Sequence, residues 1–594
     1  MISSNFISIQ SYYENIIFSL LISLLLLINL VLSTRYLSEK KFFFSKNNVL
    51  SESLIFFFLI SSISYIFYFI ALLGFNLSLL RFIIICLNLI LLLFYINNFK
   101  TKIFIKDLNN FDYLILFFFL ILAFAPTSDA DSLDYHLGYP LELLRNEKYL
   151  VRDDWFHSKI TGIGEFYILF GLIAGSPIFG QIVNFLGLYY FFRFIDGLIK
   201  KQKIDNLKAR TLIFSTPLLL WFVYSQKIQL LPSVMTPLLF IYLKDTVQKN
   251  LKNYSIFLIN LTFIFFCKVN FIFISVLIFF FSLKYINNKK KYFFLVFCIG
   301  TILVIPRFYT NYVFFGDIYP PIFEQFKSNP NIEFLDFTKD LGRDRASFKF
   351  IFYEYFFFPI KFVINKDLKS SSILLSVFYL FLIYFVINFK HYFKNSLFQF
   401  ILINTIILLV LPNFQPRYFL ETYWFLILLI LSNYSLIKNN LFFKLIHYLA
   451  KIEFILVIIV LSYFSVFYFS ANFGKARYNL IMSNIAQNFK LIYWLGDKIP
   501  KNKVVVSNAI RSHALYQNEF ISREEYFRED PFEMNKKYKP DYFILTADNE
   551  LILNEFSRCL LYTGYEKEFY NEARNPFGQK KNKYKVRIYE NFCK

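Results

Sequence analysis

The chain consists largely of long apolar runs separated by short basic segments. Hydrophobic residues make up 57% of its 594 residues, and 83 of them are Phe. A soluble domain cannot bury so much apolar surface, whereas a helix of about 20 such residues spans the ~30 Å core of a bilayer. The sequence therefore predicts an all-α polytopic membrane protein with about 14 transmembrane helices.

The basic residues give the expected orientation of these helices. The net charge of +22 comes from Lys and Arg clusters between apolar runs, where they act as topology signals, so nucleic-acid binding is not expected. No Lys or Arg precedes the first run, 16–32, whereas Arg35, Lys40 and Lys41 follow it. This pattern predicts an N-terminus on the outer face of the membrane.

The order of the runs then predicts two large outer loops, 127–160 and 307–350. Gly175 and Pro177 split the region 163–198, which we interpret as one crossing plus a partial helix, with two short crossings as the alternative. Lys268 interrupts the run 255–283, which predicts two short helices meeting at an outward turn. Segment 351–364 is expected along the interface. The other crossings after residue 200 are expected at 212–224, 230–243, 293–306, 373–387, 400–411, 420–431 and 454–469.

The first outer loop carries an acidic cluster at a membrane boundary. Asp129, Asp131, Asp134 and His136 lie directly after the fourth run, 113–125. Carboxylates at a bilayer edge are tolerated mainly where they meet water, a partner or a substrate. We interpret this loop as the candidate active site. The adjacent pair Asp153 and Asp154 is expected to be solvated.

The C-terminal part, from about residue 471, is less apolar. Short β-type runs at 503–507, 542–546 and 586–589 predict a small α/β domain on the outer face. An oxidising outer compartment permits a disulfide between Cys559 and Cys593, with two buried free thiols as the alternative.

Asp131, Asp134 and His136 are the candidate catalytic residues for transfer of a group to a hydroxyl. A carboxylate can take the acceptor proton, and we expect Asp131 to do so, with Asp134 raising its pKa by like-charge repulsion. Cations can hold a phosphate leaving group; the candidates are Lys268, Arg307 and Arg417. Independent snorkelling of the two arginines at the interface is the alternative interpretation.

Three segments carry a family resemblance: DSLDYHL at 131–137, RFYTNYVFFGDIYP at 307–320 and QPRYFL at 415–420. Their order resembles that of the GT-C superfamily of integral-membrane glycosyltransferases, in the bacterial branch related to family 39 protein mannosyltransferases and the lipid A aminoarabinose transferase. The best-known members have an acidic pair where this chain has Asp131 and Ser132, which leaves the acceptor and a divalent metal requirement open. The same segments supply the candidate substrate-binding residues Tyr135, Asn311, Tyr319, Gln415 and Tyr418.

The resemblance implies inverting transfer of a sugar from a polyprenyl-phosphate-linked donor to a lipid, glycan or protein acceptor of the cell envelope. It implies a multi-pass protein of the bacterial inner membrane, in contact with membrane lipid, with its active site on the periplasmic face and no required cofactor. The expected domains are additional N-terminal helices (1–110), a GT-C-like catalytic module (111–470) and an extracytoplasmic α/β domain (471–594). The alternatives are a transporter or flippase of an anionic lipid-linked sugar, and a non-catalytic assembly factor.

Overall fold

The computed structural model describes most of the chain. The described residues are 7–40, 48–98, 108–150, 152, 155–204, 207–245, 251–286, 288–319, 360, 363, 374–410, 416–501, 503–507, 512–522, 530–546, 556–572 and 580–593. Asp153, Asp154 and Gln415, most of the second outer loop and nearly all of the expected interfacial segment 351–364 lie outside these ranges.

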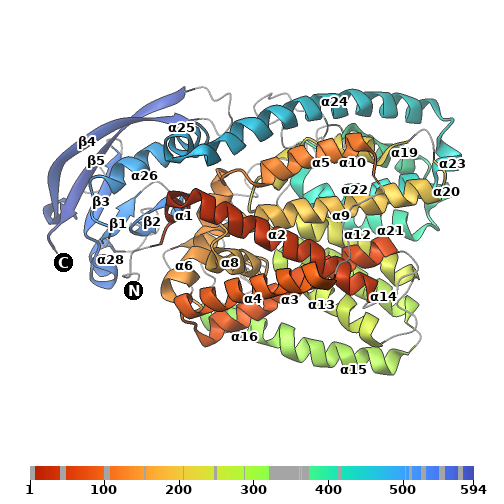
Figure 1. Ribbon diagram of the computed structural model, residues 1–594, viewed down its shortest axis with the longest axis horizontal. Coiled ribbons are helices and arrows are strands. Elements are labelled where there is room, and N and C mark those ends of the chain that lie inside the picture. Colours follow the sequence, from red (N-terminus) through yellow and green to blue (C-terminus); the bar gives the residue numbers. More distant parts are fainter. Residues whose placement is uncertain are drawn as a thin grey trace.

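Helices form the larger part of the molecule, and many of them lie side by side along its long axis (Figure 1). Within the described ranges, six helices are long and apolar enough to cross a membrane. They are α2 (Ile16–Glu39), α3 (Asn48–Leu73), α4 (Leu77–Asn98), α9 (Phe179–Lys201), the continuous pair α15 and α16 (Lys289–Phe315), and α24 (Leu441–Phe469) with its extension η7 (Ser470–Phe473).

Shorter apolar helices fill the bundle between these six. They are α5 (Asn110–Ala123), α8 (Glu165–Ala174), α10 (Ala209–Phe214), α11 (Leu218–Val223), α12 (Leu230–Asp245), α13 (Leu251–Cys267), α14 (Phe271–Tyr285), η5 (Val377–Leu380) with α19 (Phe381–Ile387), α21 (Ser396–Val410) and α22 (Leu420–Ser432). Short helices complete the ends: α1 (Ile9–Glu14), α6 (Gly138–Asn146), α7 (Phe156–Lys159), α20 (Phe389–Tyr392) and α23 (Tyr434–Ile437). A helical fold is thus confirmed, while the count of 14 crossings stays a prediction.

The expected helix breaks are partly confirmed. Helices α8 and α9 separate at Gly175, which has a left-handed φ of 109° and ends α8, and α13 and α14 meet at a turn that contains Lys268. The expected crossing 212–224 is not one continuous helix, because the chain breaks at Pro217 into α10 and α11, and its passage through the membrane stays a prediction. Proline disfavours helical geometry at the residue before it and has no N–H to continue the helix.

The helix also continues beyond Pro306, where the crossing 293–306 was expected to end. Pro306 lies in the first turn of α16 (Ile305–Phe315), where its missing N–H is not needed, and a π-helical turn, η2 (Gly300–Val304), precedes it. The helix continues until Gly316, whose φ of 63° is left-handed. Arg307 is therefore inside a helix rather than at the start of the second outer loop.

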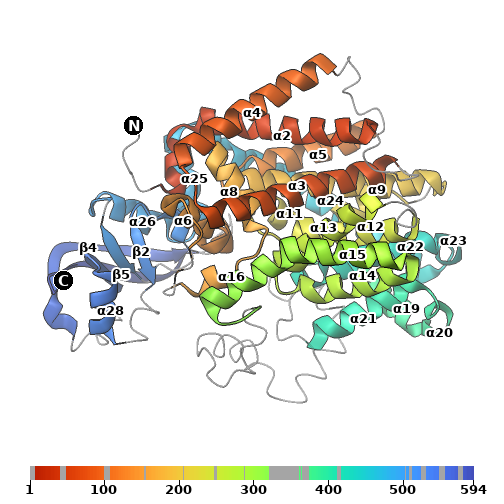
Figure 2. The ribbon, with the colours of Figure 1, turned by 90° about the horizontal axis from the view of Figure 1, so that it is seen from below.

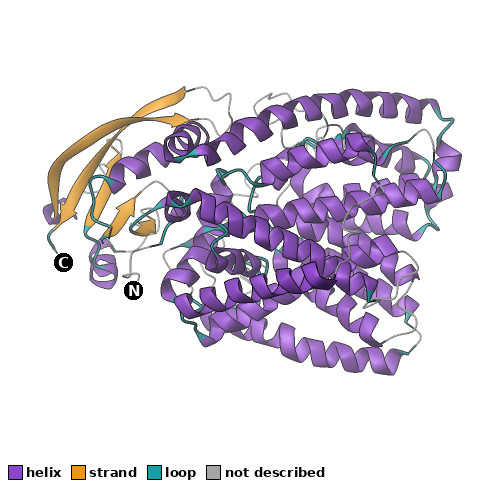
Figure 3. Ribbon diagram, in the orientation of Figure 1, coloured by secondary structure: helices purple, strands orange, loops and turns teal. Residues whose placement is uncertain are grey.

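The C-terminal sheet lies at one end of the helical bundle (Figure 3). Its strands are β1 (Val504–Ser507), β2 (Glu519–Ser522), β3 (Tyr542–Thr546), β4 (Leu560–Glu572) and β5 (Lys580–Asn591), in the order β2-β1-β3-β5-β4. Strand β1 pairs in parallel with β2 and β3, and β5 pairs antiparallel with β3 and β4. Helices α25 (Lys475–Ile485), α26 (Phe489–Gly496) and α28 (Pro531–Tyr538) complete the domain.

The predicted α/β character of this domain is confirmed, and so is the Cys559–Cys593 disulfide. The two cysteines have Cα atoms 5.0 Å apart and join the start of β4 to the end of β5. Strands β2 and β4 were not expected. Strand β4 reads LLYTGYEKEFYNE, with charged and polar residues on a largely exposed strand, so it lacks the apolar alternation of a buried one.

The acidic loop and the C-terminal domain lie at the same end of the bundle (Figures 1 and 2). The loop forms the π-helical turn η1 (Ser132–His136), and both η1 and α6 pack against η8 (His513–Leu515) of the C-terminal domain. The turn after α3 is at this end too, since the Phe75 amide donates to the Glu147 carbonyl at 2.8 Å. The side of the membrane that this end faces stays a prediction.

Candidate active site

The acidic loop begins where α5 ends and is shaped by the carboxylate of Asp129. Oδ2 of Asp129 accepts hydrogen bonds from the amide (2.9 Å) and the hydroxyl (2.7 Å) of Ser132, as an N-cap residue does at the start of a helical turn. The indole Nε1 of Trp221, from α11, donates to its other oxygen at 3.1 Å. This local capping fixes where Asp131 points.

Asp131 forms ion pairs with two cations from distant parts of the chain. Nζ of Lys227, in the turn between α11 and α12, lies 2.5 Å from Asp131 Oδ2, and a guanidinium nitrogen of Arg417, in η6 (Pro416–Phe419), lies 3.4 Å from the same oxygen. The Asp131 side chain is 21% exposed, Arg417 17% and Lys227 only 1%. The carboxylate therefore reaches the surface, while Lys227 holds it from inside.

Lys227 is enclosed on its remaining sides by the same loop and by an aromatic ring. Its ammonium lies 3.4 Å from Asp129 Oδ1 and 3.5 Å from the centroid of the Trp221 ring. A desolvated ammonium is stabilised by both kinds of contact. Trp221 thus binds Asp129 through its N–H and Lys227 through its face.

These cations determine the ionisation of Asp131. Burial alone would raise the pKa of this carboxyl, but Lys227, its hydrogen bond, Arg417 and Lys268 together hold the pKa well below its ordinary value. The expected increase by Asp134 is wrong. The π-helical turn points Asp134 elsewhere, where Oδ1 accepts from Trp155 Nε1 at 3.1 Å and Oδ2 lies 2.8 Å from His157 Nδ1.

His136 contacts the carboxylate of Glu165 and not that of Asp131. Its Nδ1 lies 2.9 Å from Oε1 of Glu165, whose other oxygen accepts from the Gly162 amide at 2.8 Å. Burial, with Lys268 and Lys227 nearby, lowers the pKa of His136 well below its usual range, so the ring is neutral. The Tyr135 ring stacks on His157, with centroids 5.4 Å apart, and its other neighbour is the tilted ring of His136, with centroids 4.1 Å apart.

Lys268 and Arg307 line one small cavity beside this cluster. The walls also include Ile160, Thr161, Gly162, Phe266, Val269, Asn311 and Tyr319. The guanidinium of Arg307 donates to the Tyr149 hydroxyl at 2.9 Å and to the Thr161 carbonyl at 2.7 Å. Gly162 allows the close approach of this loop to α13, since a Cβ there would lie 2.1 Å from the Cys267 carbonyl oxygen.

Lys268 differs from the other cations because its ammonium has no hydrogen-bond or ion-pair partner among the described residues. Burial, together with repulsion from Arg417 and Lys227, lowers the pKa of Lys268 to about 7. Asp131 and Glu165 act on it only at longer range. Below that pH, an incoming anion would therefore find a cation whose charge is not yet neutralised.

Arg417 and Tyr418 are held at the edge of the site by a bond from the Lys227 turn. Gln229 Nε2 donates to the Arg417 carbonyl at 2.7 Å, and the Arg417 guanidinium donates to the Tyr418 hydroxyl at 3.1 Å.

Asn311 donates to the Ile318 carbonyl at 2.9 Å, and the Tyr319 hydroxyl donates to the Phe265 carbonyl at 2.9 Å. Asn311 and Tyr319 thus shape the cavity wall.

The chain matches the family model described as the DUF1420 N-terminal domain over residues 87–482. The chain belongs to the DUF1420 family. No curated protein matches it. The DUF1420 region runs from α4 to α25 and carries every side chain of the cluster around Asp131, while the sheet of the C-terminal domain lies beyond it.

Within the DUF1420 region, the structure brings some of the expected residues together and separates others. Asp131 and Arg417 are in contact, and Lys268 lies within electrostatic range of both. Arg307 shares a cavity with Lys268 but has its own partners. Asp134 and His136 bind other residues, and the described part of the chain contains no group of three His, Cys, Asp or Glu side chains that could hold a metal ion.

Sequence reasoning missed several residues of this site, which are Asp129 as a Lys227 partner, Trp155, Glu165, Trp221 and Lys227. Lys227 gave a usable signal, because Gln226, Lys227 and Gln229 are polar residues in a short turn between two apolar runs. In the structure, the backbone amide of Gln226 donates to the Ser132 hydroxyl at 3.0 Å, so this turn of the DUF1420 region packs directly on the acidic loop.

Proposed function

We propose that the protein is a membrane glycosyltransferase of the GT-C type, which moves a sugar from a polyprenyl-phosphate-linked donor to a lipid, glycan or protein acceptor. One observation carries the proposal: Asp131 is a partly exposed carboxylate in contact with Lys227 and Arg417, at one end of a bundle of membrane-length helices. Lys268, whose ammonium pairs with no carboxylate in the described part of the chain, lies within electrostatic range. The proposed location is the outer face of a bacterial inner membrane.

The charges of the cluster favour an anionic ligand. Lys227, Lys268 and Arg417 face Asp129 and Asp131, so the fully ionised cluster has one more positive than negative charge. A phosphodiester restores neutrality, and a guanidinium is well shaped to bind two of its oxygens. Because the site lies at a helix-bundle end, a donor with a lipid tail can place its phosphate there while the tail stays in the membrane.

Donor binding also explains how Asp131 becomes a base. In the free protein its ion pairs keep its pKa low, which makes it a poor proton acceptor. A phosphate that takes over Arg417 and Lys268 weakens the pull on Asp131 and raises its pKa. The acceptor hydroxyl then attacks the anomeric carbon, the bond from that carbon to the phosphate oxygen breaks, and the hydroxyl proton passes to Asp131. The cations stabilise the departing polyprenyl phosphate.

Reconstituted vesicles test this proposal against its main alternative. The purified full chain is incorporated into liposomes with polyprenyl-phosphate-linked sugars, one labelled hexose or pentose at a time, and a total envelope extract as acceptor. We expect label in a product other than the donor, with inversion at the anomeric carbon. Label that crosses the bilayer while still attached to its polyprenyl phosphate would instead support a flippase.

A further inference from the structure

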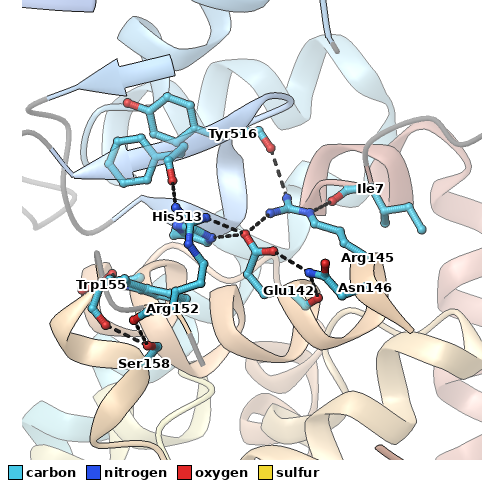
Figure 4. Close-up of polar contacts among 11 residues, drawn as sticks. Ile7, Glu142, Arg145, Asn146, Arg152, Trp155, Ser158, His513 and Tyr516 are labelled. Carbon is cyan, nitrogen blue, oxygen red and sulfur yellow. Dashed lines mark hydrogen bonds and ion pairs between the residues drawn. The ribbon is translucent and has the colours of Figure 1, made fainter. Parts of the chain in front are cut away.

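A buried polar cluster joins the acidic-loop region to the C-terminal domain (Figure 4). Its centre is Glu142 of α6. Oε1 of Glu142 lies 2.8 Å from His513 Nε2, 3.2 Å from Arg145 and 3.1 Å from Arg152. Burial opposes ionisation of Glu142, but Arg145, the His513 hydrogen bond and Arg152 hold its pKa well below its usual range. Glu142 is therefore an anion whose Oε1 is shared by three donors.

Both arginines also bind the backbone of the C-terminal domain. Arg145 donates to the Tyr516 carbonyl at 3.3 Å, and Arg152 donates to the Phe520 carbonyl at 2.6 Å. Arg145 donates in addition to the Ile7 carbonyl at 2.7 Å, before α1. Three segments that are far apart in sequence are thus attached to one carboxylate.

Besides its hydrogen bond to Glu142, His513 makes a second contact, with Trp155 of the acidic loop. Its ring stacks on the indole of Trp155, with centroids 4.0 Å apart and planes 12° apart. The same indole donates from Nε1 to Asp134 at 3.1 Å. Burial lowers the pKa of His513, so its ring is neutral and its Nε2–H donates to Glu142.

The stack depends on a close approach that the sequence permits at Gly138. Gly138 follows Leu137, the C-cap of η1. A Cβ at Gly138 would lie 3.0 Å from Cη2 of Trp155 and 3.1 Å from Cβ of His513. Such contacts are tighter than ordinary van der Waals packing. The start of α6 is thus shaped to admit both rings.

We infer that His513 and Trp155 are positioning residues through which the C-terminal domain sets the conformation of the acidic loop. The contacts run from His513 to Trp155, from Trp155 to Asp134, and along η1 to Asp131, three residues earlier. The C-terminal sheet domain is then a component of the site and not an appendage to it. Where the inference concerns catalysis, it rests on the proposed function; where it concerns the loop, it does not.

Two substitutions of His513 separate the stack from the hydrogen bond. His513→Phe keeps an aromatic ring against Trp155 and removes the donor to Glu142, which still has Arg145 and Arg152. His513→Gln keeps a donor and removes the stack. Trp155→Phe keeps a ring and removes the bond to Asp134. The control, Glu533→Gln, changes an exposed residue of α28 in the same domain.

Hydrogen–deuterium exchange of the full chain in detergent measures the loop directly. We expect Trp155→Phe to reduce protection of residues 132–137 by about tenfold, as loss of a hydrogen bond to a charged group implies. We expect His513→Gln to reduce it as well, through loss of the aromatic stack that holds Trp155. We expect His513→Phe and Glu533→Gln to match the wild type. Unchanged protection in Trp155→Phe, or a loss in His513→Phe with none in His513→Gln, would overturn the inference.

Sugar transfer by the same four variants is a second measurement. It distinguishes positioning of the acidic loop from a purely structural role of His513 and Trp155. We expect kcat to fall in His513→Gln and Trp155→Phe while the donor KM stays within about twofold, since the cations that bind phosphate are untouched. Loop loosening in a protein whose wild type transfers no sugar would refute the proposed function and leave the positioning inference standing. A fall in kcat with unchanged loop protection would refute positioning.

Discussion

Nζ of Lys227 lies 2.5 Å from Oδ2 of Asp131, across 96 residues of sequence. The ammonium is almost fully buried, whereas the carboxylate is partly exposed. A buried cation that loses its partner becomes an uncompensated charge at a large cost, whereas the exposed carboxylate can exchange one neighbour for another. This asymmetry makes Lys227 the fixed member of the site and Asp131 the reactive one.

Lys227→Met should destabilise the protein, whereas Lys268→Met should not. Lys227 neutralises two carboxylates, and losing this shared cation, with Arg417 still paired to Asp131, should cost about 1–3 kcal/mol. The ammonium of the half-buried Lys268 has no hydrogen-bond partner among the described residues, so removing it should be neutral or stabilising. Titration with a denaturing detergent measures both. Equal losses would contradict the division of roles, and Lys227→Arg serves as the charge-retaining control.

Asp131→Asn should abolish the proposed base and keep the shape of the side chain. We expect sugar transfer to fall by about 10²-fold or more, because proton abstraction by a positioned group contributes about that much. Asp129→Asn is the matched comparison, since Asp129 shares Lys227 but caps the loop through Ser132. Labelled-sugar transfer in reconstituted membranes is the measurement. Full activity in Asp131→Asn would refute the assignment, and equal losses would indicate a diffuse electrostatic role.

Apolar runs and basic turns predicted much of the fold. The runs around Lys268 and Gly175 predicted helix pairs that the structure contains, because a charged side chain or a left-handed glycine interrupts a helix for local reasons. The prediction at Pro306 was wrong because a proline can either end a helix or occupy its first turn, and Pro306 occupies the first turn of α16. Strand β4 was missed because an exposed strand does not need apolar alternation.

The site was less predictable than the fold. Three carboxylates within six residues made the acidic loop recognisable in the sequence. The partner of each carboxylate, however, is determined by tertiary contacts. Lys227 reaches Asp131 only because the turn after α11 packs on η1, and Asp134 is drawn to Trp155 because η1 is π-helical. No spacing along the chain encodes those contacts, so the expected Asp131–Asp134 pair had no local signal against it.

Cysteine labelling should place the acidic loop and the sheet on the outer face. Ser78 and Glu533 are exposed and lie at the sheet-bearing end, whereas exposed Asn439 lies in the basic turn between α23 and α24. In a background with Cys86 and Cys298 replaced by Ser, a membrane-impermeant maleimide should label Ser78→Cys and Glu533→Cys in intact cells. Asn439→Cys should be labelled only after permeabilisation. The reverse pattern would invert the predicted topology.

Donor binding should weaken as the pH rises through about 7, and Lys268 should be the cause. Its pKa is lowered to about 7 by burial and by Arg417 and Lys227, so its positive charge is present below that pH and lost above it. A sugar phosphodiester keeps its charge over this range, and its binding should raise the Lys268 pKa and take up about half a proton at pH 7, approaching one proton at higher pH. Linkage of one proton predicts affinity that falls by up to about tenfold per pH unit above 7.

Calorimetric titration of the full chain with a polyprenyl-phosphate sugar measures this effect at pH 6, 7 and 8. Running the titration at pH 7 in two buffers of different ionisation enthalpy counts the protons taken up. Lys268→Arg should bind with nearly constant affinity across the range, because a guanidinium stays charged throughout it. A wild-type affinity that does not change with pH, or an equal slope in Lys268→Arg, would show that Lys268 does not contact the phosphate.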